Sequence, residues 1–337
     1  MKSLTHRLFI SLFSVLFLYM CPLFLLAQDP IQAPEGIPPE SDYMMRQHQE
    51  QIEEIMKVSN PGDREKSLES FRKKLDPKSL ILSYYENYFV LTVQAYTQAG
   101  NTAQAQALSR KMQKLFPNSL TTHGALMIEA FKSRNYAKAI QSGEKINSAS
   151  PNQQTTEVLA QSYIAIKNAD NAAKYSLKAL EGTNAKQGAQ YVAFLAGYYW
   201  NKRDIVNSAK YYNILLKAFP GSGPQGWDWN STKISAYYTL AQKAQYVDKN
   251  YDAAIKEYRA VLKINPKHDA SHAGIGMSHW RLQQLEEAMD AFAKAVVIGQ
   301  TAAAKARVNL EQIYKPRNNN SVEGLDALLE KARAALQ

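Results

Sequence analysis

Cysteine is nearly absent from this chain. Cys21 is the only cysteine among 337 residues, and it lies in an N-terminal stretch that we expect to be removed. The remaining chain can form no intramolecular disulfide and no thiolate metal site. After residue 27 the sequence also contains no apolar run long enough to span a bilayer.

The sequence motifs of common enzymes are missing as well. We find no phosphate-binding loop, no serine elbow and no zinc-binding His-Glu-x-x-His pattern. Gly274 and Gly276 begin a dinucleotide-like pattern, but His279 stands where a third glycine is required. Carboxylate pairs such as Glu53-Glu54 are adjacent, so on a helix they diverge by about 100° and do not flank one atom. We therefore predict no catalytic residues and no cofactor.

Three histidines, His268, His272 and His279, lie close together in the sequence. Two imidazoles four residues apart on a helix can bind one metal ion. No cysteine or carboxylate completes a ligand set, and two of the three occupy positions where the repeat described below packs aromatic side chains. We predict packing roles and no metal site.

The N-terminus has the pattern of a secretory signal, residues 1–27. Lys2 and Arg7 precede a nearly continuous apolar stretch, residues 8–26, and Ala27 offers a small residue for cleavage. Two alternatives remain: an uncleaved membrane anchor, although Pro22 interrupts it, and a lipoprotein signal at Cys21, which the bulky Met20 disfavours. We expect an exported protein, periplasmic or at the cell surface.

Charge is positive but dispersed. The chain has 40 Lys and Arg against 30 Asp and Glu, a formal net charge of +10. No run of cations is longer than Arg72-Lys73-Lys74, so we do not expect nucleic acid as a partner. An acidic protein partner or an anionic envelope surface fits this balance better.

Beyond the signal, proline marks a linker and helical patterns follow. Residues 28–40 contain four prolines and one glycine, which predicts an extended linker. From residue 41 the apolar spacing is helical, and strand-like alternation is absent. Residues 41–85 are expected to form two N-terminal helices, at 43–58 and 64–75. Residues 301–337 are expected to form two capping helices, at 303–314 and 322–336, the second capped by Ser321.

Residues 86–300 repeat six times. A small residue recurs with spacings of 34, 33, 36, 46 and 34, and in four repeats a proline follows twelve residues later. The long spacing indicates an insertion at residues 221–232, which contains Trp227 and Trp229. The fifth repeat, around Tyr238, Ala241 and Gln245, fits least well and reads as one residue out of register. The recurring small residues are Ala105, Ala139, Ala172, Ser208, Ala254 and Ala288.

The last repeat carries the clearest pattern: Ile275-Gly276, His279, Ala288 and Phe292, with Pro266 ending the preceding helix. These residues resemble the tetratricopeptide repeat family. The resemblance implies an all-α fold, a right-handed superhelical solenoid of antiparallel helix pairs, with a concave face lined by the first helix of each pair. It also implies a non-catalytic scaffold that binds another protein or a peptide.

The resemblance implies that the partner-binding residues lie on the first helix of each pair, on the face opposite the residues that pack against the neighbouring helices. Aromatic anchors with a few cations favour an extended or helical peptide with apolar and some acidic side chains. We expect Phe131, Trp200, Tyr246 and Trp280 to share one surface. The neighbouring polar positions are Gln94, Thr97, Gln98, Gln161 and Asn201. The predicted partner-binding residues are Ile128, Phe131, Lys132, Ile164, Trp200, Lys243, Tyr246, Met277, Trp280 and Arg281.

Two other functions stay open at this point. Trp227, Trp229 and Trp200 are candidates for stacking on sugar rings, which describes a carbohydrate-binding or cell-wall-associated module. A helical-repeat enzyme of the envelope is the third possibility, although no residue motif favours it. The oligomeric state and the partner's identity have no sequence signal.

Overall fold

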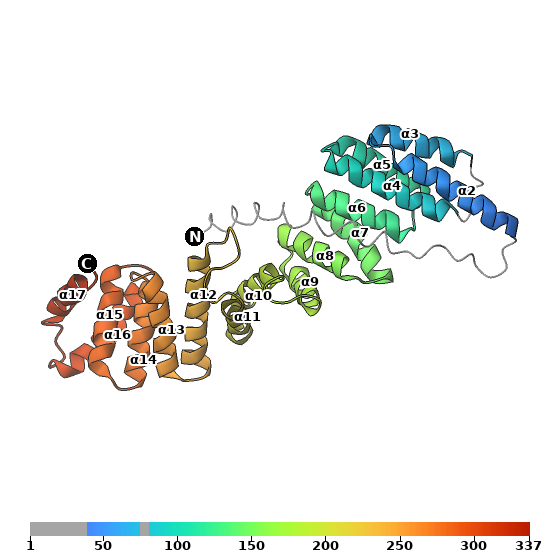
Figure 1. The fold of residues 1–337 in the computed structure, drawn as a ribbon. Helices are drawn as coiled ribbons and strands as arrows, with labels where there is room; N and C mark the ends of the chain where they lie inside the picture. The colour runs from blue at the N-terminus through green and yellow to red at the C-terminus, as the bar shows by residue number, and fades with distance from the viewer. Residues whose placement is uncertain (1–38, 75–80) are drawn as a thin grey trace. The chain divides into compact units, whose positions relative to one another are not determined.

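The computed structural model describes residues 39–74 and 81–337, where every regular element is a helix (Figure 1). The all-α prediction is confirmed. None of the described helices has the length and apolarity needed to cross a membrane. The predicted signal, residues 1–27, and linker residues 28–38 lie outside the described part of the chain.

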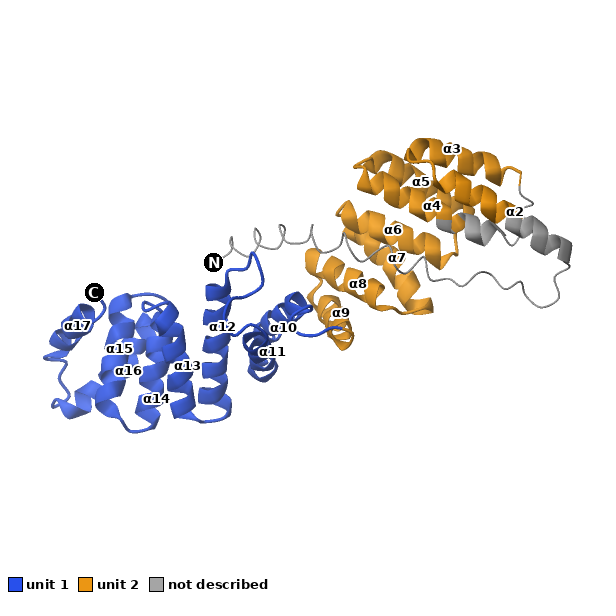
Figure 2. Cartoon of the chain, viewed as in Figure 1, with its two compact units in different colours: residues 1–15, 183–337 blue, residues 16–182 orange. Residues whose placement is uncertain are grey.

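The described residues fall into two compact units, which we treat separately (Figure 2). Unit 2 ends at Gly182, and unit 1 contains Thr183–Gln337. In both units most helices pack mainly against a helix that is next to them along the chain. The helices of unit 2 are α2 (Pro39–Met56), α3 (Pro61–Arg72), α4 (Ile81–Gln98), α5 (Thr102–Leu115), α6 (Leu120–Lys132), α7 (Tyr136–Ala149), α8 (Gln153–Ala165) and α9 (Ala169–Glu181).

Unit 1 continues the pattern of helix pairs with one irregular element. Its first helices are α10, α12, α14 and α16, and α12 runs directly into the π-helix η1. The bounds are α10 (Ala189–Asn201), α11 (Ile205–Ala218), α12 (Trp229–Gln242), η1 (Lys243–Val247), α13 (Tyr251–Ile264), α14 (Asp269–Arg281), α15 (Leu285–Ile298), α16 (Ala303–Arg317) and α17 (Leu325–Ala334).

The six recurring small residues all lie at buried helix contacts. Each has at most 1% of its surface exposed. Small side chains there let the two helices of a pair approach closely. Ser208, the only polar member, satisfies its hydroxyl by donating to the Ala196 carbonyl, 2.8 Å away. The register read from the sequence therefore matches the packing.

The recurring prolines set where the second helices end. The helices α5, α7, α11 and α13 each stop two residues before a proline. A proline ring disfavours helical geometry in the residue before it, so the helix ends there. These prolines are Pro117, Pro151, Pro220 and Pro266.

The turn inside each helix pair has a common geometry that our sequence analysis did not identify. One residue per turn adopts a positive φ, and the next residue is the N-cap of the second helix. In five turns the residue that caps the second helix donates its backbone N–H to a carbonyl five residues earlier, as Asn168 does to Tyr163. The positive-φ residues are Gly100, Arg134, Lys167, Arg203, Lys249 and Gln283.

The fifth repeat departs from this geometry by one residue. Asn250 donates to the carbonyl of Ala244, six residues earlier. The extra residue is absorbed by η1, because a π-helix places one more residue in its turn than an α-helix does. This explains why the repeat around Ala241 read as one residue out of register.

Only half of the extra length that we assigned to an insertion at residues 221–232 lies in a loop. The loop before α12, residues 219–228, has ten residues, whereas the loop between α13 and α14 has four. The first helix, α12 with η1, has nineteen residues, whereas α14 has thirteen. Each part is six residues longer than its counterpart, which accounts for the twelve extra residues. Residues 229–232 therefore belong to a helix and not to a loop.

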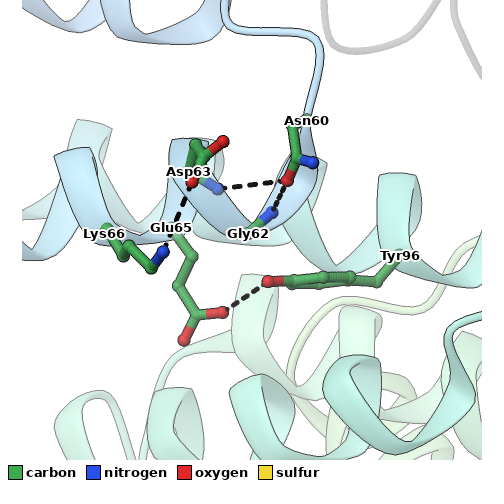
Figure 3. Close-up of polar contacts among 6 residues, drawn as sticks. All are labelled: Asn60, Gly62, Asp63, Glu65, Lys66 and Tyr96. Atoms are coloured by element: carbon green, nitrogen blue, oxygen red, sulfur yellow. Dashed lines mark hydrogen bonds and ion pairs between the residues drawn. The ribbon is translucent and has the colours of Figure 1, made fainter.

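The N-terminal hairpin is attached to the first repeat through Tyr96 (Figure 3). The Asn60 side chain caps α3 by accepting from the backbone N–H groups of Gly62 and Asp63. The Tyr96 hydroxyl on α4 donates to Glu65 on α3 at 2.8 Å. Burial, together with this carboxylate, raises the pKa of Tyr96 to about 12.

Several predicted helix ends differ from the observed ones. Helix α2 begins at Pro39, inside the predicted linker, because proline suits the first position of a helix. Pro316 lies in the last turn of α16, where we expected a loop. Ser321 accepts from the backbone N–H of Glu323, but α17 begins only after Gly324, which has a φ of 85°.

Candidate functional site

Unit 1 presents a continuous group of aromatic side chains on its first helices. Trp200 on α10 is 38% exposed and meets Tyr238 on α12 edge to face, with ring centres 6.1 Å apart. Tyr246 on η1 is 48% exposed. Arg281, at the end of α14, is close enough to act electrostatically on the Tyr246 hydroxyl. We call Trp200, Tyr238, Tyr246 and Arg281 the aromatic surface.

The aromatic surface carries one exposed cation. Burial raises the pKa of Tyr246, and the neighbouring Arg281 guanidinium opposes that rise. Arg281 is exposed and forms no ion pair with any described residue. An apolar surface with an uncompensated guanidinium suits a ligand that combines an apolar side chain with a carboxylate.

A buried polar network fixes the π-helix that carries Tyr246. The Gln245 amide donates to the Gly274 carbonyl and to the Ser278 hydroxyl, both at 2.9 Å. The Tyr258 hydroxyl donates to the Gln245 side-chain oxygen at 2.9 Å. Because buried amides and hydroxyls are costly to leave unpaired, these bonds hold Gln245 inward. Tyr246, the next residue, consequently faces outward.

Lys243, one of the predicted partner-binding residues, forms an ion pair within the protein. Its ammonium lies 2.7 Å from the Asp248 carboxylate at the other end of η1. The pair closes over the π-helix and neutralises the charge locally. Arg281 is therefore the predicted cation of unit 1 that stays available to a partner.

Met277 and Trp280 are only partly available. Both are half-buried and pack against the core formed by α15, α16 and α17. The Trp280 ring meets Phe292 edge to face at 6.3 Å. Truncating Trp280 therefore removes core packing together with any surface contact, so this residue is a poor probe of binding.

The predicted site residues of unit 2 are mostly packed. Ile128 and Phe131 lie against the core around Met127 and Ala139, and the Phe131 ring is 5.9 Å from Tyr136. Ile164 is half-buried, whereas Lys132 is exposed. Gln161, which we placed on the concave face, is buried. That Phe131 shares one surface with the aromatic residues of unit 1 stays a prediction.

Trp227 and Trp229 do not form an exposed pair. Trp229 is 8% exposed, its indole N–H donates to the Gly221 carbonyl at 3.1 Å, and its ring packs on Phe219. Trp227 is half-buried. A sugar cannot stack on Trp229, because the ring holds the preceding loop in place.

The three clustered histidines each have a partner within the protein. His268 caps α14 by accepting from the Ser271 backbone N–H, His272 meets the Pro266 carbonyl at 3.0 Å, and His279 meets the Gln284 side chain. Within the described residues, no group of three or more His, Cys, Asp or Glu side chains is placed to hold a metal ion.

Acid is expected to destabilise the protein through three of its histidines, which are not the same three as the cluster above. Burial lowers the pKa of His123, His268 and His272 below the usual 6.5. The unfolded chain therefore takes up protons first, and stability is lost as the pH falls below about 6.5. Thermal denaturation at about pH 7.5 and pH 5.5 should show the loss. His272→Gln, which keeps a donor for Pro266, should reduce it; an unchanged pH dependence would contradict this assignment.

Residues 234–268 and 270–297 match the family model for the tetratricopeptide repeat. This part of the chain therefore consists of tetratricopeptide repeats. The two matched segments run from within α12 to within α15 and include Tyr238, Tyr246 and Arg281 of the aromatic surface. No curated protein sequence matches the chain.

Solved structures of other repeat proteins are similar at low identity. One, from a study of Pseudomonas aeruginosa pilF, is 16% identical, covers 66% of this chain and 96% of its own, and has a TM-score of 0.35. A tetratricopeptide repeat protein from Parabacteroides merdae is 13% identical, covers 82% and 99%, and has a TM-score of 0.39. The C-terminal part of a Cytophaga hutchinsonii repeat protein is 17% identical, covers 70% and 98%, and has a TM-score of 0.40.

Proposed function

We propose that this protein is a non-catalytic scaffold whose aromatic surface in unit 1 binds a peptide segment of another protein. The repeats themselves support a protein–protein interaction scaffold. The observation that carries the finer proposal is the pair of exposed rings, Trp200 and Tyr246, on first helices of neighbouring repeats. Large exposed aromatic residues are unusual on a surface without a partner, and they dominate the energy of many interfaces.

The chemistry of the surface favours one kind of peptide. Trp200, Tyr238 and Tyr246 offer aromatic contact over three elements, and Arg281 stands beside Tyr246. A bidentate bond from the guanidinium to a carboxylate adds orientation as well as energy. The ligand is therefore a segment with a bulky apolar side chain followed or preceded by Asp, Glu or a C-terminal carboxylate.

The protein acts outside the cytoplasm on this proposal. The basic Lys2 and Arg7, the apolar residues 8–26 and Ala27 support export. A chain whose only cysteine is Cys21 needs no redox control in an oxidising compartment. Fractionation of cells that produce the full chain, with N-terminal sequencing of the mature protein, tests this. A mature protein found in the cytoplasm with residues 1–27 intact would contradict export.

Binding is tested with a displayed library of random peptides. Peptides selected on the wild-type protein should lose at least ten-fold in affinity for Trp200→Ala/Tyr246→Ala, because aromatic anchors often contribute about 2 kcal/mol or more each. Fluorescence anisotropy with the selected peptides gives the Kd. Arg281→Gln should mainly slow association and weaken the salt dependence.

The matched control is Val206→Ala/Val308→Ala. Both valines are exposed in unit 1, on α11 and α16, which carry no residue of the aromatic surface. This variant should keep the wild-type Kd. Equal binding by the Trp200→Ala/Tyr246→Ala protein, with its circular dichroism spectrum intact, would place the binding site elsewhere.

A further inference from the structure

Unit 2 has a second surface feature, which is basic and not aromatic. Lys132 ends α6, Arg134 forms the turn to α7, Lys138 lies in the first turn of α7, and Lys167 forms the turn between α8 and α9. All four side chains are exposed, and none forms an ion pair with a described residue. We call these four residues the basic edge.

The two turns of the basic edge belong to neighbouring repeats, so we expect them to lie side by side. Helix α8 packs against both α6 and α7. Equivalent positions of successive repeats form a row in a stacked solenoid. The carboxylates nearest in sequence are Glu129, which is half-buried on α6, and Asp170 in the first turn of α9. The cations therefore outnumber the carboxylates along this edge.

The two cationic turn residues have a backbone conformation that is unusual for residues other than glycine. Arg134 and Lys167 each have a φ of 61°, a conformation that glycine adopts without steric cost and other residues do not. Gly100 takes that position in the first repeat, with a φ of 75°. Five of the six turns have a residue other than glycine at this position, and both of those in unit 2 are long cations.

The equivalent turns of unit 1 are different in charge. Arg203 is followed directly by Asp204, and Lys249 is preceded by Asp248. In unit 2 the neighbours of Arg134 are Ser133 and Asn135, and Lys167 is followed by Asn168. In unit 2, therefore, neither Arg134 nor Lys167 has an acidic residue directly beside it in the sequence.

An exposed apolar residue indicates what covers this edge. Ile166, next to Lys167 at the turn, is 47% exposed. A row of long cations with an apolar side chain at its outer end is the pattern of a surface that rests on anionic lipid: the ammonium and guanidinium groups reach the headgroups, and the apolar group enters the boundary beneath them.

We propose that the basic edge of unit 2, Lys132, Arg134, Lys138 and Lys167 with Ile166, binds the anionic headgroups of a membrane surface. This site is separate from the aromatic surface, and it orients the scaffold on the envelope. The binding is electrostatic, so it weakens as salt shortens the range of the charges.

Vesicle co-sedimentation tests the proposal. The protein without residues 1–27, which keeps every described helix, should sediment with phosphatidylglycerol vesicles and not with phosphatidylcholine vesicles. Arg134→Gln/Lys138→Gln/Lys167→Gln should lose at least ten-fold in binding, since each cation near an anionic surface contributes about five-fold. Ile166→Ser should weaken binding without changing its salt dependence. The control Lys256→Gln/Lys305→Gln/Lys331→Gln removes the same charge from exposed positions of unit 1 and should bind as the wild type does.

Three results would overturn the proposal. The first is wild-type binding by the Arg134→Gln/Lys138→Gln/Lys167→Gln variant, with an unchanged circular dichroism spectrum. The second is an equal loss in the unit 1 control, which would show a response to net charge alone. The third is binding of soluble poly-L-glutamate through the basic edge without vesicle binding, which would assign the edge to an acidic protein. Loss of peptide binding in Trp200→Ala/Tyr246→Ala has no bearing on these outcomes.

Discussion

Replacing Gly274 by alanine is expected to lower the free energy of unfolding of unit 1 by about 3 kcal/mol, at the upper end for overpacking. A Cβ atom at Gly274 would lie 2.3 Å from Cζ of the Tyr258 ring. Tyr258 is fully buried, and its hydroxyl is bonded to both Gln245 and Gln242. The ring therefore has no free direction in which to move, and the helices α13 and α14 must separate.

The matched control for this prediction is Gly197→Ala. Gly197 also lies in a first helix of unit 1, α10, but a Cβ atom there meets nothing within 4 Å. Alanine at an unobstructed helical position stabilises by about 0.5–1 kcal/mol relative to glycine. Chemical denaturation followed by tryptophan fluorescence measures both variants in unit 1, because Trp200, Trp227, Trp229 and Trp280 all lie there. The same sign of change in the two variants would contradict the packing argument.

The repeat register could be predicted from the sequence because it rests on a periodic requirement. Ala254 and Ala288 recur where two helices approach most closely, and Pro266 recurs where a helix must end. Close helix packing selects small residues, and helix ending selects proline, so each requirement can be recognised from one kind of residue. The spacing of the small residues therefore predicts the helix pairs, and the prolines predict where the second helices end.

The turn residues could have been predicted from the helix-capping residues that follow them. A basic residue, glycine or glutamine precedes the residue that caps each second helix, and that capping residue is Asn or Asp in five of the six turns. Asn and Asp are strong helix N-caps. The recurrence of Asn101, Asn135, Asn168, Asp204 and Asn250 at the repeat spacing is a signal that our sequence analysis overlooked.

The π-helix and the burial of site residues could not be predicted in this way. One residue added between Ala244 and Asn250 changes the register, but the sequence does not say whether the chain absorbs it in a turn or in a helix. The structure absorbs it in η1, which is held by Gln245. Whether Trp280 is a groove residue or a core residue likewise depends on the packing of α16 and α17 against it.

In unit 2, we expect a substitution of Glu144 to cause the largest loss of stability. Its two carboxylate oxygens each accept one tyrosine hydroxyl at 2.7 Å, from Tyr163 on α8 and from Tyr175 on α9. The two rings stack with centres 5.6 Å apart. One side chain of α7 thus bonds to both helices of the next repeat. Burial and the carboxylate raise the pKa of Tyr163 to about 12 and also raise that of Tyr175.

Glu144→Leu should lower the free energy of unfolding by about 3–4 kcal/mol. It removes two charge-assisted hydrogen bonds and leaves two buried hydroxyls without their acceptor, at about 1–3 kcal/mol each. In a Tyr163→Phe/Tyr175→Phe background the same substitution should cost much less, because no hydroxyl is then left unpaired. Urea denaturation followed by circular dichroism, arranged as this double-mutant cycle, measures the coupling. Equal costs in the two backgrounds would mean that Glu144 does not hold the tyrosines.

Alkaline titration gives an independent check on Glu144. The raised tyrosine pKa values mean that the unfolded chain loses its phenolic protons first, from about pH 10. Stability conferred by the neutral hydroxyls is therefore present below about pH 10 and is lost as the pH rises toward about 12. In Glu144→Leu the two phenols lose the neighbouring charge, so part of the phenolate absorbance should appear at lower pH than in the wild type. An identical titration of the two folded proteins would show that the carboxylate does not act on Tyr163 and Tyr175.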